Sequence, residues 1–239
     1  MPDTRSHRGA HPDDERLFAP EALPLLQSAC ADLCWLLSRG YANPSSIKLV
    51  GDRYALSARQ RTAVARCACS DQAAERRRRS TIAPADVAGR ALWIDGYNAL
   101  TTIEAALGGG VILAACDGCY RDMASMHGSY RKVAETLPAL QLLGEFIAAL
   151  QVSGTTWLLD SPVSNSGRLK TIIQKLADES GWNWDVALVQ NPDSVLAKTE
   201  HVVASADSMI LDGCACWLSL ARLTVEKCIP DAHVVDLSV

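Results

Sequence analysis

Apolar residues in the first part of the chain recur at intervals of three and four positions, the spacing of one face of a helix. This pattern predicts one helix that begins near Pro20 and a second that begins at Ser57, whose hydroxyl can cap the first turn. Between them, the run IKLV at 47–50 has the character of a short strand. Residues 1–16 are polar and are predicted to be disordered, so residues 17–86 are expected to form a small helical module.

The pattern changes near residue 91, where short β-prone runs begin to alternate with helical segments. The runs are ALWID (91–95), VILAAC (111–116), TTWLLD (155–160), WDVALV (184–189), HVVASA (201–206) and HVVDL (233–237). Strands that alternate with helices require a mostly parallel sheet covered on both faces. The predicted fold class is therefore α/β, with a central, mostly parallel sheet of five or six strands within residues 87–239.

Composition narrows the class of protein. The chain has 239 residues, and no uninterrupted apolar run approaches the roughly 18 residues needed to span a bilayer. The N-terminal segment also lacks the apolar core of a signal peptide. The nine cysteines are an odd number and are interpreted as reduced thiols rather than as a disulfide framework. A cytoplasmic protein without a membrane partner is expected.

Charge is distributed unevenly along the chain. Residues 1–90 hold 14 Lys and Arg against 10 Asp and Glu, whereas residues 91–239 hold 9 against 17. The basic part could bind a polyanion while the acidic part binds cations, although ordinary solvated faces would give the same totals. The run 76–79 is interpreted as a charged linker. The candidates for contact with a nucleic-acid backbone are Arg53, Arg59, Arg61 and Arg66.

Several predicted strands end in a carboxylate. In open α/β sheets, ligands bind beyond the carboxyl ends of the strands, so these side chains are expected at one edge. Gathered carboxylates repel one another unless a cation neutralises them, and hard oxygen ligands suit Mg²⁺ or Mn²⁺. Asp also caps helices well, which would explain any single case without a metal. The residues concerned are Asp95, Asp117, Asp160 and Asp207, together with Asp193 at a helix start.

Four of these segments resemble one known group of enzymes. LWIDGYNAL resembles the opening strand of the NYN branch of the PIN-like nucleases, and WLLDSPVSNSGR, NPDSVLA and VVASADSMILD resemble later elements in the same order. The resemblance covers residues 91–237. It implies a PIN-like three-layer fold in which the metal ligands are Asp95, Asp160, Asp193 and Asp207. It also implies that Asn98 and Ser205 orient ligands or phosphate.

The sequence departs from that pattern in VVASAD, where an extra Ala separates Ser205 from Asp207. The chain as a whole, including VGDRYALSARQRTAVARCACSD, resembles a prokaryotic family labelled only as domain of unknown function 434. That second resemblance implies no activity. It does imply that the basic front segment and the PIN-like part act as one unit.

Further candidates lie in the segment 117–131, for which a helix is expected after the preceding strand. A His and an Arg near a metal could contact phosphate or shuttle a proton, although the same His could be a core residue. The residues that could bind phosphate or support the metal ligands are Asp117, Asp122, His127, Arg131 and Asp212.

The cysteines give little support for a zinc site at this level. Structural zinc usually uses paired thiols two to four residues apart on loops, and Cys116 with Cys119 is the pair with a two-residue gap at a strand exit. Cys214 and Cys216 fall in a helix expected over 213–228, where buried thiols act as small hydrophobic groups.

The function predicted from these features is divalent-metal-dependent hydrolysis of phosphodiester bonds, with RNA as the substrate by analogy to the resembled family. One alternative is a non-catalytic RNA-binding or adaptor protein on a degenerate PIN-like scaffold. Another is a small-molecule phosphatase or nucleotide hydrolase, although no Walker-type phosphate loop is present. A homodimer is left open.

Overall fold

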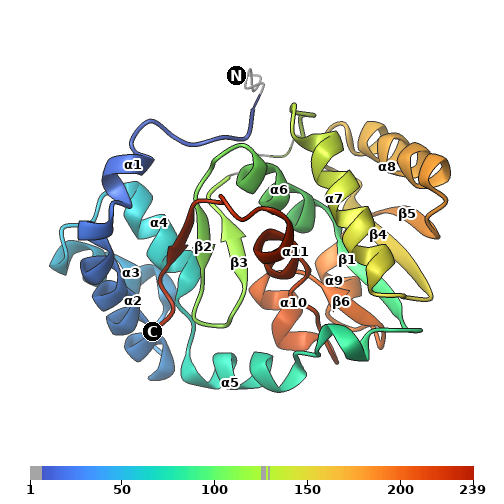
Figure 1. Cartoon of the computed structure of the whole chain (residues 1–239). Helices are drawn as coiled ribbons and strands as arrows, with labels where there is room; N and C mark the ends of the chain where they lie inside the picture. The colour runs from blue at the N-terminus through green and yellow to red at the C-terminus, as the bar shows by residue number, and fades with distance from the viewer. Residues whose placement is uncertain (1–6, 125–127, 129) are drawn as a thin grey trace.

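The strands of the protein form two separate sheets. The computed structural model describes residues 7–124, 128 and 130–239 (Figure 1). In the central sheet all strands run parallel in the order β5-β4-β1-β6, and their bounds are β1 (Ala91–Asp95), β4 (Gly154–Asp160), β5 (Trp184–Val189) and β6 (Val202–Ala204). The predicted α/β class with a central parallel sheet is confirmed.

The second sheet has the order β3-β2-β7, with bounds β2 (Ile112–Ala114), β3 (Tyr120–Asp122) and β7 (Val234–Asp236). Two runs assigned to the central sheet pair with each other here, so the prediction of five or six central strands is wrong. The prediction of a helix over 117–131 is also wrong for its first residues, which form a turn and β3. Gly118, with φ of 82°, turns the chain straight back after β2, and residues 120–122 pair antiparallel with it.

Side chains of the central strands alternate between two cores on opposite faces of the sheet. Leu92 and Ile94 of β1 enter the larger core, whereas Trp93 packs against the smaller one. The helices over the larger core are α6 (Gly96–Leu107), α7 (Thr136–Ala149), α8 (Ser166–Ser180) and α11 (Leu220–Cys228). Those over the smaller core are α9 (Pro192–Leu196) and α10 (Ser208–Gly213). The central sheet is thus covered on both faces.

A small helical part precedes the sheet, as predicted, and packs on the second sheet rather than on the first. Its helices are α1 (Asp14–Leu17), α2 (Leu23–Ser38), α3 (Asn43–Arg53), α4 (Ala58–Cys67) and α5 (Asp71–Ser80). Leu26 and Leu33 of α2 share one core with Leu113 of β2 and Val235 of β7. Figure 1 shows α1 to α4 on the left, next to β2, and α5 along the bottom. No helix of the described residues is long and apolar enough to cross a membrane.

Three local predictions for this part are wrong. The run 47–50 lies in α3 because Ile47 and Val50, three residues apart, pack on the same core. The run 76–79 lies in α5 and is no linker. Disorder was expected over residues 1–16, of which 1–6 lie outside the described residues. The described remainder is held by an ion pair between Arg8 Nε and Glu104 of α6 at 2.5 Å and by a pair between Asp14 and Arg59 of α4.

The segment before α11 is also extended rather than helical. Trp217 is buried and forms isolated bridges to Thr81 and Val203, and its indole Nε1 donates to the carbonyl of Arg77 at 2.8 Å. These bonds hold Cys214 and Cys216 outside α11, where the sequence predicted a helix. Trp217 thereby joins the end of α5 to the edge of the central sheet.

Candidate active site

The strand order reverses beside β1, because β4 lies on one side of it and β6 on the other. Such a switch point leaves a crevice beyond the carboxyl ends of the two strands. Asp95 ends β1 and caps α6, where its Oδ1 accepts a bond of 3.4 Å from the N–H of Asn98. Ser205 follows β6, and its Oγ donates to Asp95 Oδ2 at 2.8 Å. The ends of the two strands are therefore tied together by side chains.

The extra residue before Asp207 is accommodated at this crevice. The N–H of Ala206 donates to Asn98 Oδ1 at 2.9 Å, and the N–H of Asp207 donates to Ser205 Oγ at 3.0 Å. Asp207 then caps α10, where its Oδ1 accepts from the N–H of Met209 at 2.8 Å. The inserted Ala therefore places this carboxylate at a helix start that faces the crevice.

The four acids assigned as metal ligands influence one another electrostatically. Burial, together with repulsion from Asp193 and Asp207, raises the pKa of Asp95 to about 7, although hydrogen bonds from Ser205 and Asn98 act in the opposite direction. Burial and then the charges of Asp207 and Asp160 raise the pKa of Asp193, and burial raises that of Asp160. That all four side chains hold a metal together stays a prediction.

No hydrogen bond or ion pair from the described residues reaches the carboxylates of Asp160 and Asp193. In the described part of the chain, the three metal-ligating atoms that lie within 4.8 Å of one another are thiols elsewhere, so the acids do not form a compact set of three ligands. Carboxylate oxygens are ligands of the type that hard cations such as Mg²⁺ use.

An open cavity of about 440 Å³ lies against Asp95 and Asp207. Two arginines reach it, one from each part of the chain: Arg66 of α4 and Arg121 of β3. Tyr97 also lines the cavity, and its hydroxyl is buried without a hydrogen-bond partner among the described residues. Burial and then the charge of Asp160 raise the pKa of this hydroxyl to about 12. An unsatisfied donor at the wall of a polar cavity fits a bound anion or water.

The arginines of the cavity are held in fixed positions. Arg121 Nε donates to the carbonyl of Ala206 at 2.9 Å, and Arg66 donates to the carbonyl of Ala124 at 3.0 Å. Asp122, at the end of β3, is satisfied locally, because it accepts from Thr102 at 3.0 Å and from the N–H of Ala124 at 2.7 Å. Asp122 thus supports the wall of the cavity that carries Arg66.

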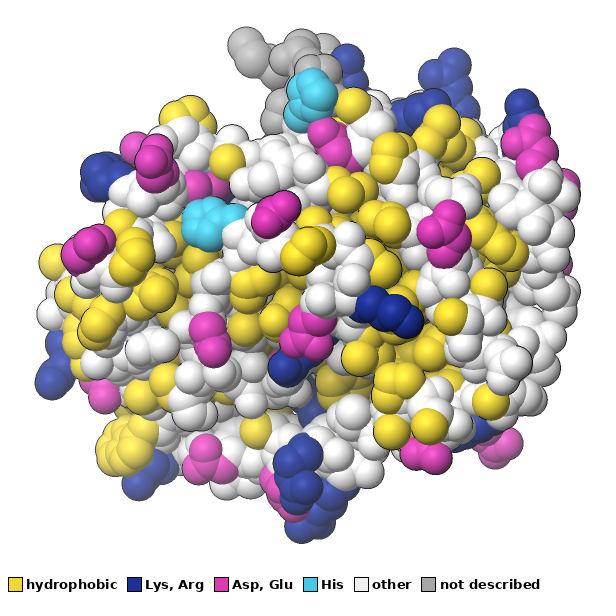
Figure 2. All heavy atoms as spheres, in the orientation of Figure 1, with side chains coloured by type: hydrophobic (Ala, Val, Ile, Leu, Met, Phe, Trp, Pro, Cys, Tyr) yellow, Lys and Arg dark blue, Asp and Glu magenta, His cyan; other side chains and the backbone are white. Residues whose placement is uncertain are grey.

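Of the four arginines predicted to bind nucleic acid, the structure brings Arg66 to this cavity. The other three pair with acids of the helical part: Arg53 with Asp32 at 3.4 Å, Arg59 with Asp14, and Arg61 with Asp52 at 2.8 Å. Figure 2 shows basic and acidic side chains interspersed over these helices and over α5 on the face drawn. The positive charge in excess within residues 1–90 is therefore partly neutralised by acids on this face.

Buried Asp117 and exposed Asp212 both pair with Arg77, which is itself buried. Arg77 contacts Asp117 at 2.7 Å and Asp212 at 2.8 Å, and Arg121 contacts Asp117 at 2.6 Å. Burial alone would raise the pKa of Asp117, but the two arginines lower it overall. These two acids anchor arginines, and Asp117 reaches the cavity indirectly through Arg121.

Among the described candidates, Asp160, Asp193 and Arg131 do not line this cavity. Arg131 lines a different cavity, with Lys132 and Arg168. His127 lies outside the described residues. Arg121, in contrast, was not predicted, because a helix was expected there. The Asp117–Gly118 dipeptide after a β-prone run was the available signal for the hairpin that presents it.

These features define an α/β protein with an acidic cavity at a topological switch point. The chain belongs to the family described as Domain of unknown function (DUF5616), whose model matches residues 84–223, and residues 25–80 match Protein of unknown function (DUF434). An uncharacterized protein of Methanocaldococcus jannaschii is 30% identical over 186 residues, which cover 78% of this chain and 88% of that protein. No solved structure matches significantly. The cavity takes residues from both matched segments: Arg66 lies within 25–80 and Asp95 within 84–223.

Proposed function

We propose that the chain is a divalent-metal-dependent nuclease that hydrolyses phosphodiester bonds in RNA at the cavity beside Asp95. The observation that supports this most is the hydrogen-bonded pair of Asp95 and Ser205 within a group of four mutually repelling carboxylates. The parallel sheet with its reversal beside β1 also suits the resemblance to PIN-like and NYN proteins. RNA as the substrate rests on that resemblance.

Asp95, Asp160, Asp193 and Asp207 would hold one or two Mg²⁺ or Mn²⁺ ions. When bound, such an ion lowers the pKa of a water and neutralises charge on the phosphate. Ser205 and Asn98 hold Asp95 and the chain after β6 in place. Arg66 and Arg121 supply positive charge in the lining of the same cavity, where a phosphate group of the substrate would contact them.

The test is cleavage of labelled single-stranded RNA, structured RNA and DNA with Mn²⁺, with Mg²⁺ and with EDTA. Metal-dependent cleavage that is lost in Asp95→Asn supports the proposal. Asp185→Asn is the matched control, because Asp185 is an exposed acid on β5 that lies outside the cavity. Cleavage should be unchanged in this control.

Two results would overturn the proposal in different ways. RNA binding that weakens with salt, without any cleavage, would identify a non-catalytic RNA-binding protein. The extra residue before Asp207 and the loose spacing of the carboxylates favour this second candidate. Hydrolysis of small phosphate esters but not of RNA would identify a phosphatase instead.

A further inference from the structure

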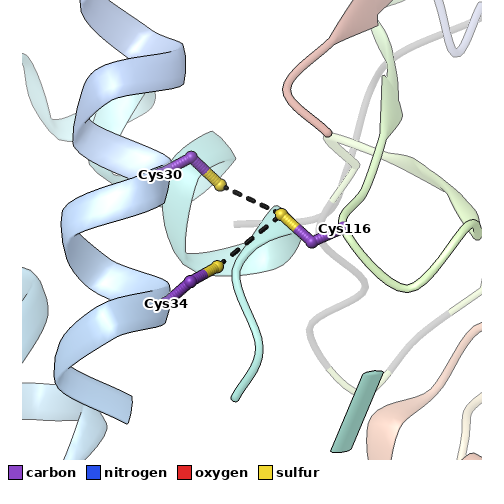
Figure 3. Close-up of side chains that lie close together, drawn as sticks. All are labelled: Cys30, Cys34 and Cys116. Atoms are coloured by element: carbon purple, nitrogen blue, oxygen red, sulfur yellow. Dashed lines mark hydrogen bonds between the residues drawn. The ribbon is translucent and has the colours of Figure 1, made fainter. Parts of the chain in front are cut away.

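Three thiols from two distant parts of the sequence converge, and none of them lines the acidic cavity. Cys30 and Cys34 lie four residues apart on α2 and therefore on one face of it, and Cys116 lies in the turn after β2. The sulfur of Cys116 lies 3.5 Å from that of Cys30 and 3.6 Å from that of Cys34. Figure 3 shows all three side chains directed toward one point between the helix and the turn.

The spacing of the three sulfurs matches tetrahedral thiolate coordination. A Zn–S bond of about 2.3 Å and tetrahedral angles place neighbouring sulfurs roughly 3.8 Å apart. The three sulfurs all lie within 4.8 Å of one another. Among the described residues, no other group of three possible metal ligands is as compact. Cys30 is fully buried and Cys34 is 9% exposed, whereas Cys116 is half-buried, so two of the three thiols are shielded from solvent.

A backbone hydrogen bond ties the cluster to the end of α4. The N–H of Cys116 donates to the carbonyl of Cys67, the last residue of that helix, at 3.0 Å. The turn that carries Cys116 is therefore fixed against the helical part of the chain.

We propose that Cys30, Cys34 and Cys116 bind a thiophilic divalent cation, Zn²⁺, that links the helical part to the second sheet. Water or the thiol of Cys69 would complete the tetrahedron. Thiolate ligands select zinc over Mg²⁺ and Mn²⁺, so this site is distinct from the acidic cavity in metal as well as in place.

The position of Cys116 gives this metal a structural role. The next residue, Asp117, binds Arg77 of α5 and Arg121 of β3, and Arg121 lines the acidic cavity. A metal at Cys116 would fix the start of the β2–β3 turn against α2. It would thereby hold Arg121 in place without contact with a substrate.

The test is elemental mass spectrometry on the full chain, purified under reducing conditions without chelators. About one zinc per chain is expected, as for a structural site. Cys116→Ser and Cys30→Ser should each lose it, whereas Cys228→Ser should keep it, because Cys228 at the end of α11 is outside the cluster. Asp95→Asn should also keep zinc, which separates this site from the proposed nuclease site.

A measurement on the unaltered chain guards against variants that fail to fold. Replacement of zinc by Co²⁺ should give thiolate-to-cobalt charge-transfer absorption, and removal of the metal should lower the melting temperature. A folded protein with little zinc and all three thiols free to react with an alkylating reagent would overturn the proposal. A mass lower by two hydrogens, with Cys116 joined to Cys30 or Cys34 in a disulfide, would overturn it too.

Discussion

Ser205 Oγ lies 2.8 Å from Asp95 Oδ2 and joins the end of β6 to the end of β1. The bond crosses the point where the strand order reverses, between two residues that are 110 positions apart in sequence. It stabilises the charged form of Asp95 against burial and against the charges of Asp193 and Asp207. The Ser205–Asp95 bond therefore bears directly on the charge available to a metal.

Replacing Ser205 with Ala should reduce metal-dependent cleavage roughly 10- to 100-fold, because a hydrogen bond to a charged group is worth about 1.5–3 kcal/mol. The pKa of Asp95 should rise further, so the acidic limb of the pH–rate profile should move to higher pH. Ser205→Thr keeps the hydroxyl and should restore most activity. An unchanged pH profile in Ser205→Ala would show that the bond does not tune Asp95.

In EDTA, the folded protein should lose stability as pH rises. The pKa of Asp95 is raised in the folded state to about 7 from 3.8, so protonated Asp95 favours the folded state. Its contribution is fully present below 3.8 and is lost as pH rises to about 7. Urea unfolding across this window should show a steeper fall in the free energy of unfolding for the wild type than for Asp95→Asn. Parallel curves would contradict the raised pKa.

Tyr97 allows a test that separates binding from packing. Its hydroxyl is buried at the cavity without a partner among the described residues, so Tyr97→Phe removes a group that makes no stabilising bond there. The melting temperature should not fall, but cleavage should decrease roughly 10-fold if the hydroxyl contacts the substrate. Unaltered cleavage would assign Tyr97 to packing alone.

Much of the central sheet could be predicted because its strands are local patterns. The run 184–189 matches β5 in full, and Asp95 and Asp207 both line the cavity beyond the ends of β1 and β6. The pairing of β2 with β7 could not be predicted, because a β-prone run looks the same whichever sheet it joins. The short run 47–50 was equally ambiguous, since its apolar positions suit a helix or a strand.

The ion pairs of Arg77 and the thiol cluster depend on contacts between residues far apart in sequence. Arg77 was assigned to a linker from its neighbours in sequence, but its burial is set by Asp117 and Asp212, 40 and 135 residues away. The thiol cluster could not be predicted from local Cys pairs, because Cys116 meets Cys30 across 86 residues. The four-residue gap between Cys30 and Cys34 on a predicted helix was the available signal.

Arg66 should contribute to substrate binding rather than to stability. It lines the acidic cavity with part of its side chain exposed, so Arg66→Ala should weaken RNA binding and reduce the slope of log affinity against log salt by about 1. Arg16→Ala is the control, because Arg16 is exposed on α1 and outside the cavity. An equal effect in both variants would indicate general charge attraction instead of contact at the cavity.

Arg77 should contribute to stability more than any exposed neighbour in the same helix. Its side chain is 4% exposed and pairs with Asp117, which is 1% exposed, so Arg77→Ala leaves a buried carboxylate without one of its two arginines. Breaking a buried pair costs about 3–5 kcal/mol, and Arg121 should keep the loss near the lower end. Arg78→Ala, in the next position but 73% exposed, should cost about 0–1 kcal/mol. Urea unfolding of the two variants measures the difference, and similar losses would contradict the buried network as the anchor of α5.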